Sequence, residues 1–184
     1  MKNSVQTASL AGLMAELPVF AGKIQQFAAD LQLDLTHYQA DHISLRAHDT
    51  ALAEQWLAGF RECGTVLSDN QINGRPIYLF LLYEPLTLLH WQIPVVELPF
   101  PKDKQYAHQG WEHIELVLPG DPQTLTERAA ALLPSPLPAG VVIKASHPHG
   151  EQERLPHPTL AVSRENITIK FHPFTLQEIV ESER

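Results

Sequence analysis

The chain has 184 residues, of which 44% are hydrophobic and 18% are charged. This length favours one domain with a substantial core, and the apolar content excludes a disordered chain. Lys and Arg number 13 against 21 Asp and Glu, which gives a net charge of −8. With this balance and no basic run, the sequence predicts no nucleic-acid partner.

Compartment and membrane association follow from the apolar pattern and the cysteine count. No apolar stretch approaches the roughly 20 residues that span a bilayer, so we expect no membrane partner. The N-terminus lacks the long apolar segment of a signal peptide. Cys63 is the only cysteine, which excludes an intrachain disulfide and favours a reducing, cytoplasmic location. The 10 histidines are the most unusual feature of the composition.

The first predicted element is helical. Apolar residues between positions 8 and 31 recur at helical spacing, at Leu10, Leu13, Met14, Leu17, Ile24, Phe27 and Leu31. Pro18 interrupts this pattern and has no N–H to donate to a helix. We therefore predict two short amphipathic helices, bent or broken at Pro18, within an N-terminal helical extension at 1–34.

Beyond residue 34 the pattern changes to short strand-like runs, and one order of elements occurs twice. The first cycle contains a strand, a capped helix and three strands, at about 41–46, 49–63, 65–67, 77–82 and 86–98. The second cycle repeats this order at about 112–117, 121–133, 141–144, 159–163 and 167–172. Asp49 and Asp121 are typical N-caps, and Pro122 suits the first helical position.

The two cycles are in register. His42 lies 71 residues before His113, Asp49 lies 72 before Asp121, and Glu97 lies 73 before Lys170. Three landmarks with nearly one offset indicate an internal duplication of a βαβββ unit. The fold prediction is α+β, with about eight strands in a domain at 35–184. Repeat one covers about 35–105 and repeat two about 106–175.

Two βαβββ units, each opening with an acidic residue, His and Ile, resemble the vicinal-oxygen-chelate superfamily of glyoxalases and extradiol dioxygenases. The run WQIPVVELPFPK at 91–102, followed by GWEHIE at 110–115, resembles more narrowly the YecM proteins, a bacterial family placed in that superfamily. The resemblance covers roughly residues 35–175. It implies a barrel made of two half-barrels, with a divalent metal ion between them.

The resemblance also implies ligand positions on the first and last strand of each repeat, which fall at His42, Glu97, His113 and Lys170. The first three are good ligands for Fe, Mn, Zn or Ni. Because a protonated lysine cannot coordinate, the site either has three ligands or has lost its metal. If metal binds, Lys170 is expected to attract an anionic ligand or transfer a proton, and it is the candidate catalytic residue.

Glu97 leaves two interpretations open, because its carboxylate lies in an apolar stretch and is costly to bury without a partner. Metal ligation predicts a metal-dependent isomerase, lyase or dioxygenase acting on a small oxygen-bearing anion. A buried Glu97–Lys170 ion pair predicts instead a metal-free module that binds or sequesters a small molecule. A structural protein with a vestigial cup is a third possibility, and either a monomer or a homodimer is compatible with the pattern.

Several residues are secondary candidates. His90 is a reserve ligand, although strand parity places it and Gln92 on the face opposite Glu97. Glu115, two residues after His113, is a possible second carboxylate, and His172 is a possible pocket residue. Arg46 and Arg75 are candidate clamps for a substrate carboxylate. No Gly-rich phosphate loop occurs, so no nucleotide cofactor is expected.

Overall fold

The computed structural model describes residues 8–72, 74–102, 108–147, 155 and 158–183. The helices are η1 (Ala8–Leu10), α1 (Ala11–Asp30), η2 (Leu35–His37), α2 (Thr50–Cys63), η3 (Pro122–Thr124), α3 (Leu125–Ala130) and α4 (Leu176–Ser182). The strands are β1 (Gln39–Arg46), β2 (Gly64–Ser68), β3 (Gln71–Ile72), β4 (Arg75–Leu88), β5 (Trp91–Pro99), β6 (Gly110–Val117), β7 (Val142–Ser146), β8 (Thr159–Arg164) and β9 (Ile167–His172). None of the helices in these ranges is long and apolar enough to cross a membrane.

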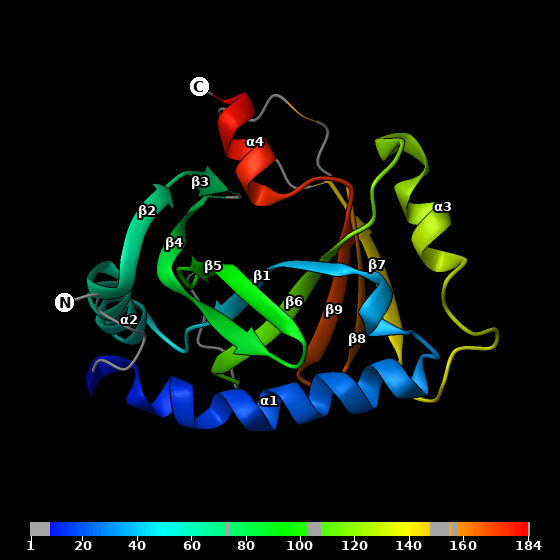
Figure 1. Ribbon diagram of the computed structural model, residues 1–184, viewed down its shortest axis with the longest axis horizontal. Helices are drawn as coiled ribbons and strands as arrows, with labels where there is room; N and C mark the ends of the chain where they lie inside the picture. Colours follow the sequence, from blue (N-terminus) through cyan, green and yellow to red (C-terminus); the bar gives the residue numbers. More distant parts are fainter. Residues whose placement is uncertain (1–7, 73, 103–107, 148–154, 156–157, 184) are drawn as a thin grey trace.

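The nine strands have the order β2-β4-β5-β1-β6-β9-β8-β7, with the short β3 paired to β4 alone. The order is symmetric about the β1–β6 pair, and each half is one βαβββ unit. The predicted duplicated α+β fold is therefore confirmed. The sheet is strongly curved, but it does not close into a complete barrel, because β2 and β7 lie at opposite ends of the described strand order (Figure 1).

Strand register places the symmetry axis. β1 and β6 are antiparallel, and Ile43 lies opposite Ile114, its equivalent 71 residues later. In repeat one β1 pairs in parallel with β5, and Ser44 lies opposite Glu97. In repeat two β6 pairs in parallel with β9, and Glu115 lies opposite Lys170. Glu97 and Lys170 therefore occupy equivalent places, as do Ser44 and Glu115.

Helices cover part of each face of the sheet. On β1, Ile43 and Leu45 point into the main core, which α1 and α2 also line, while His42 and Ser44 point to the opposite, concave face. Figure 1 shows α1 along one side of the sheet and α4 on the other. α4, which has no counterpart among the predicted elements, packs on the concave face through a second apolar cluster of Leu79, Val95, Leu176, Ile179 and Val180.

The expected pair of N-terminal helices is a single helix. α1 runs through Pro18 from Ala11 to Asp30. Apolar residues on both sides of Pro18, including Leu13 and Ile24, are buried in the same core. Their packing holds the helix together although Pro18 cannot donate its backbone hydrogen bond. The domain boundary at residue 34 stays a prediction, since α1 shares the core of the sheet.

The predicted strand at 86–98 is also different. β4 continues to Leu88, and β5 begins at Trp91. Leu89 and His90 form the turn between them, and Leu89 has a φ of 55°. The sequence conceals this turn because apolar residues continue on both sides of it. The dipeptide Asn73–Gly74 before β4 favours a turn. Asn73 lies outside the described residues, and Gly74 has a φ of +79°.

The predicted helix boundaries have clear local causes. Asp49 Oδ1 accepts the N–H of Leu52 at 2.9 Å and caps α2, which ends at Gly64. A Cβ at Gly64 would clash with the carbonyl oxygen of Leu81 on the neighbouring strand. In repeat two Asp121 Oδ1 accepts the N–H of Gln123 at 2.9 Å and caps η3, and the helix predicted at 121–133 consists of η3 and the short α3, which ends at Ala130.

Candidate metal centre

The concave face brings together three predicted ligands around the symmetry axis. His42 comes from β1, His113 from β6 and Glu97 from β5. The Nε2 atom of His42 lies 3.8 Å from Oε2 of Glu97, and the Nε2 atom of His113 lies 3.9 Å from Oε1. One ligand atom from each of the three residues lies within 4.8 Å of the others. Both imidazoles are buried, and Glu97 is 19% exposed.

These distances suit donors that share one ion. Metal–nitrogen and metal–oxygen bonds of about 2.0–2.2 Å place two ligands of one ion between roughly 3 Å apart, at a right angle, and roughly 4.3 Å apart, on opposite sides. The separations of 3.8 and 3.9 Å fall inside this range. Two imidazoles and one carboxylate are a donor set that Fe, Mn, Zn or Ni accept, with positions left for a ligand.

Two β-bulges aim a second carboxylate at each imidazole. The β1–β6 register skips Asp41 between Ala40 and His42, and it skips Glu112 on β6 in the same way. Asp41 and Glu112 are equivalent residues, 71 positions apart. An extra residue in a strand re-aims its side chain, so each acid lies beside the histidine that follows it. The acid–His–Ile pattern of the sequence is thus a structural unit repeated on both sides of the axis.

Asp41 fixes the orientation of His42. Its Oδ2 accepts a hydrogen bond from Nδ1 of His42 at 2.8 Å when that nitrogen carries the proton, and another from the N–H of Leu176 at 2.9 Å. When the ring is neutral with its proton on Nδ1, the lone pair of Nε2 is available to a metal ion. Glu112 lies 3.4 Å from Nδ1 of His113 and accepts a hydrogen bond from Arg46 at 2.6 Å.

Glu115 is a further carboxylate in contact with His42. Its Oε2 lies 2.8 Å from Nε2 of His42, yet this nitrogen has no aligned hydrogen bond among the described residues. Asp41, His42 and Glu115 form a second group whose donor atoms lie close enough to hold an ion. The sequence signal for Glu115 is its position two residues after His113 on one strand, and its contact with His42 comes from cross-strand pairing.

The electrostatics around His42 favour a positive charge. Burial opposes protonation, but the carboxylates of Glu115, Asp41 and Glu97 outweigh it and raise the pKa of His42 well above its usual value. Burial likewise opposes ionisation of Glu115, yet His42, His172 and Lys170 hold the pKa of this carboxyl well below its usual value. A proton on His42 supplies the positive charge in metal-free protein, and a metal cation can supply it instead.

His113 has the opposite tendency. Burial and the nearby Lys170 ammonium lower its pKa, against the effect of Glu112 and Glu97. The lowered pKa favours the neutral imidazole at pH 7. Metal ligation requires this neutral form. Glu112 itself ionises readily, because His113 and Arg46 lower its pKa strongly despite its burial.

Lys170 lies on the repeat-two side of the site, opposite Glu115 in the register. In the described part of the chain it forms no ion pair with Glu97, whose Oε1 instead accepts the hydroxyl of Ser44 at 2.8 Å. The alternative interpretation therefore lacks the Glu97–Lys170 contact on which it depended.

A cavity of about 390 Å³ opens over the candidate ligands. Its lining joins β5, β6 and β9 to the ends of β4 and β7 and to Leu176 at the start of α4. Glu97, His113 and Glu115 form part of its wall, and so does Lys170. Of the three candidate ligands, Glu97 and His113 therefore line the cavity, whereas His42 is fully buried and does not.

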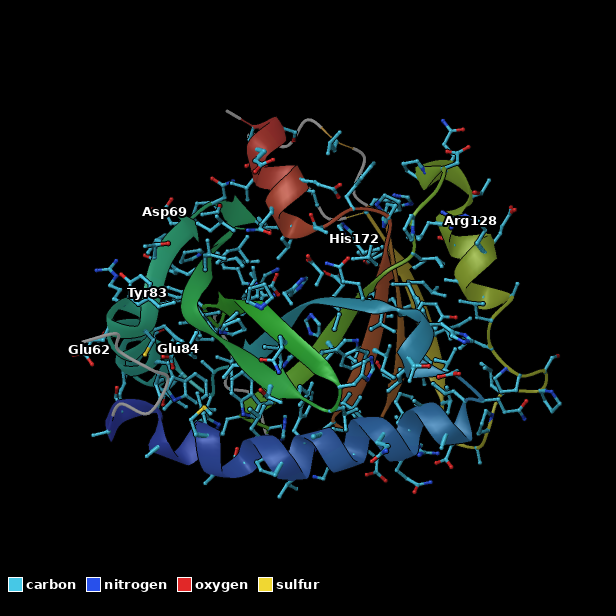
Figure 2. All side chains as sticks on the ribbon, in the orientation of Figure 1. Glu62, Asp69, Tyr83, Glu84, Arg128 and His172 are labelled. Atoms are coloured by element: carbon cyan, nitrogen blue, oxygen red, sulfur yellow. The ribbon has the colours of Figure 1, made fainter. Side chains whose placement is uncertain are left out.

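Some of the remaining predicted residues line the cavity, and the others lie outside it. Arg46 and Arg75 line the cavity. His90 and Gln92 are exposed and lie away from it. His172 is fully buried at the end of β9, where the chain turns toward α4, and acts electrostatically on Glu115 (Figure 2). Trp91 is structural, because its indole N–H donates to the carbonyl of Tyr38 at 2.9 Å.

Comparison with known proteins places this geometry in a family. A family model described as YecM protein matches residues 9–183. Protein YecM of Escherichia coli (strain K12) is 52% identical over 187 residues, covering 100% of this chain and 99% of that protein. An uncharacterized protein of Haemophilus influenzae is 39% identical over 177 residues, covering 92% of this chain and 93% of the relative. A solved structure from structural genomics has a TM-score of 0.92 and 49% identity, covering 100% of this chain and 98% of its own.

Proposed function

The chain belongs to the YecM protein family, and we propose that it binds a divalent metal ion through His42, Glu97 and His113. In this proposal the protein is a metal-dependent isomerase, lyase or dioxygenase that acts on a small oxygen-bearing anion in the cavity. The observation that carries the proposal is the convergence of two imidazole Nε2 atoms on one carboxylate, at 3.8 and 3.9 Å.

The surroundings of the three donors support ligation over simple packing. Asp41 holds the tautomer of His42 that directs a lone pair into the site, and Ser44 holds one oxygen of Glu97. Metal ligands in proteins commonly have such supporting hydrogen bonds. Lys170 occupies the predicted fourth ligand position on β9 and cannot coordinate while protonated. Glu115 on β6 provides another carboxylate, 2.8 Å from Nε2 of His42.

Different residues of the chain have different roles around the ligand in this proposal. A divalent ion, when bound, supplies Lewis-acid polarisation of a ligand oxygen. Lys170, on the cavity wall opposite Glu97, provides an ammonium that attracts an anion and donates a proton to it. Leu176 and the rest of α4 cover part of the cavity and restrict water around the ligand.

The reaction class rests on fold analogy and is the least specific part of the proposal. A duplicated βαβββ sheet with ligands near its central axis is what we expected of the vicinal-oxygen-chelate superfamily, whose members include glyoxalases and extradiol dioxygenases. We therefore propose that this chain is a member of that superfamily. We also propose a cytoplasmic location, supported by the lone Cys63, and action as a monomer or homodimer.

Metal content is the direct test. Untagged protein is incubated with Fe(II), Mn(II), Ni(II) or Zn(II), desalted, and analysed by plasma mass spectrometry beside Glu97→Ala. We expect near-stoichiometric metal in the wild type and little in the variant. Glu62→Ala is the matched control, because Glu62 is an exposed carboxylate on α2, distant from the cavity (Figure 2). Wild-type protein that stays empty with all four metals would refute the proposal.

A further inference from the structure

The cavity contains more cationic groups than the candidate metal centre uses, and we propose that they form a subsite for a second acidic group on the ligand. The ligand is then a small dianion. One end binds at His42, Glu97 and His113, and the other is held at the cavity mouth by Arg75 and Lys144. This inference rests on the proposed function and specifies the substrate class of the same site.

Arg75 is the strongest element of the subsite. It lies at the start of β4, lines the cavity together with Ile77 and Glu97, and has a buried Nε atom with no hydrogen-bond partner among the described residues. A buried donor without an acceptor is costly. A guanidinium in this state suits a carboxylate or phosphate, which can accept two parallel hydrogen bonds from it.

Strand register aligns two lysines on the opposite wall. Lys144 on β7 pairs with Ala161 on β8, and Ala161 pairs with Lys170 on β9. Paired residues share one face of a sheet, so the two lysines flank a single small side chain on the concave face. Because neighbouring strands lie about 4.8 Å apart, their Cα atoms are roughly 10 Å apart. Ala161 leaves room between them for an anionic group.

The acids of the cavity have partners other than Arg75 and Lys144, and Lys170 acts on Glu115 electrostatically without forming an ion pair with it. Glu112 is paired with Arg46, Glu115 contacts His42, and Glu97 accepts from Ser44. Arg75, Lys144 and Lys170 form no ion pair with any residue in the described ranges. With a metal ion compensating the carboxylates near the histidines, three positive side chains remain for the ligand. A monoanion at the metal would leave Arg75 and Lys144 uncompensated.

Two matched probes test the second acidic group. 2-Oxoglutarate and 2-oxopentanoate have the same five-carbon chain and the same chelating 2-oxo acid end, and they differ only in a terminal carboxylate against a methyl group. Calorimetric titration of metal-loaded wild-type protein should give an affinity for 2-oxoglutarate at least about tenfold higher. In Arg75→Gln and Lys144→Gln this ratio should fall toward one, while the affinity for 2-oxopentanoate and the metal content stay unchanged.

Arg61→Gln is the control, because it removes one exposed cation on α2 and should keep the wild-type ratio. Equal binding of the two probes by wild-type protein, or a wild-type ratio in both variants, overturns the inference while the metal proposal stands. If no metal binds, the proposed function fails, and glutarate is compared with pentanoate at low salt. A preference for glutarate that Arg75→Gln abolishes then supports the cationic subsite alone, and equal or absent binding overturns it.

Discussion

Asp41→Asn should weaken metal binding without touching a proposed ligand. Asp41 is 5% exposed, and one of its oxygens accepts from both Nδ1 of His42 and the N–H of Leu176, at 2.8 and 2.9 Å. An asparagine in this place has one acceptor oxygen, and its NH₂ group removes the negative charge that stabilises the His42 tautomer. Loss of such a supporting carboxylate lowers metal affinity by about 10- to 100-fold, which corresponds to about 1.4–2.8 kcal/mol.

The same change has a separate cost in stability. If the amide turns its NH₂ toward either donor, one buried N–H loses its partner, so the metal-free protein should lose about 1–3 kcal/mol of unfolding free energy. Competition with a chromophoric chelator measures the affinity, and urea unfolding in EDTA measures the stability. Asp34→Asn is the control, since Asp34 caps η2 from an exposed position and asparagine caps equally well. A folded Asp41→Asn protein that binds metal within twofold of wild type would contradict the role of Asp41.

Glu97→Gln keeps an acceptor for Ser44 but removes the charge, and it should lower metal affinity more than Asp41→Asn in the same titration; a smaller loss would argue against ligation. In metal-free protein the pKa of His42 is raised above its unfolded value near 6.5. Its contribution to the free energy of unfolding is therefore complete below about pH 6.5 and is lost as the pH rises through the folded-state pKa. Thermal unfolding between about pH 6 and 9 should therefore show stability falling as pH rises, and bound metal should remove this fall. Gly64→Ala should cost more than about 2 kcal/mol in urea unfolding because of the Leu81 carbonyl, whereas Gly22→Ala, in open space on α1, should stabilise by about 0.5–1 kcal/mol.

The sequence predicted the duplication because a repeat depends on periodicity, whereas the three candidate ligands were placed by the resemblance to the vicinal-oxygen-chelate superfamily. A strand alternates its side chains, and a nearly constant offset of 71 to 73 residues brings equivalent positions to equivalent places. The resemblance implied ligand positions at His42, Glu97 and His113, and the structure brings donor atoms of these three residues together. The continuity of α1 could not be assigned, because Pro18 is unfavourable locally and only the shared core on both sides compensates for it.

The details that shape the site depend on contacts between strands distant in sequence. The β-bulge at Asp41 is part of the pairing between β1 and β6, so β1 alone does not indicate that Asp41 turns toward His42. The contact of Glu115 with His42 follows from the β1–β6 register, which a single strand does not encode. α4 is short, and its burial depends on Leu79 and Val95 from the first repeat.

The backbone of the concave face is nearly symmetric, but the charges of equivalent residues on its two halves differ. Ser44 and Glu115 are equivalent, as are Glu97 and Lys170, yet within each pair the two residues differ in charge. Crossing the axis from β5 to β9 exchanges an anion for a cation at one structural position. The backbone would accept a ligand in two orientations related by half a turn, but the electric field across the axis favours one of them. The two halves of the duplicated sheet therefore differ in charge at equivalent positions, and under the proposed function we expect an unsymmetrical anion to bind with its acidic end toward Lys170.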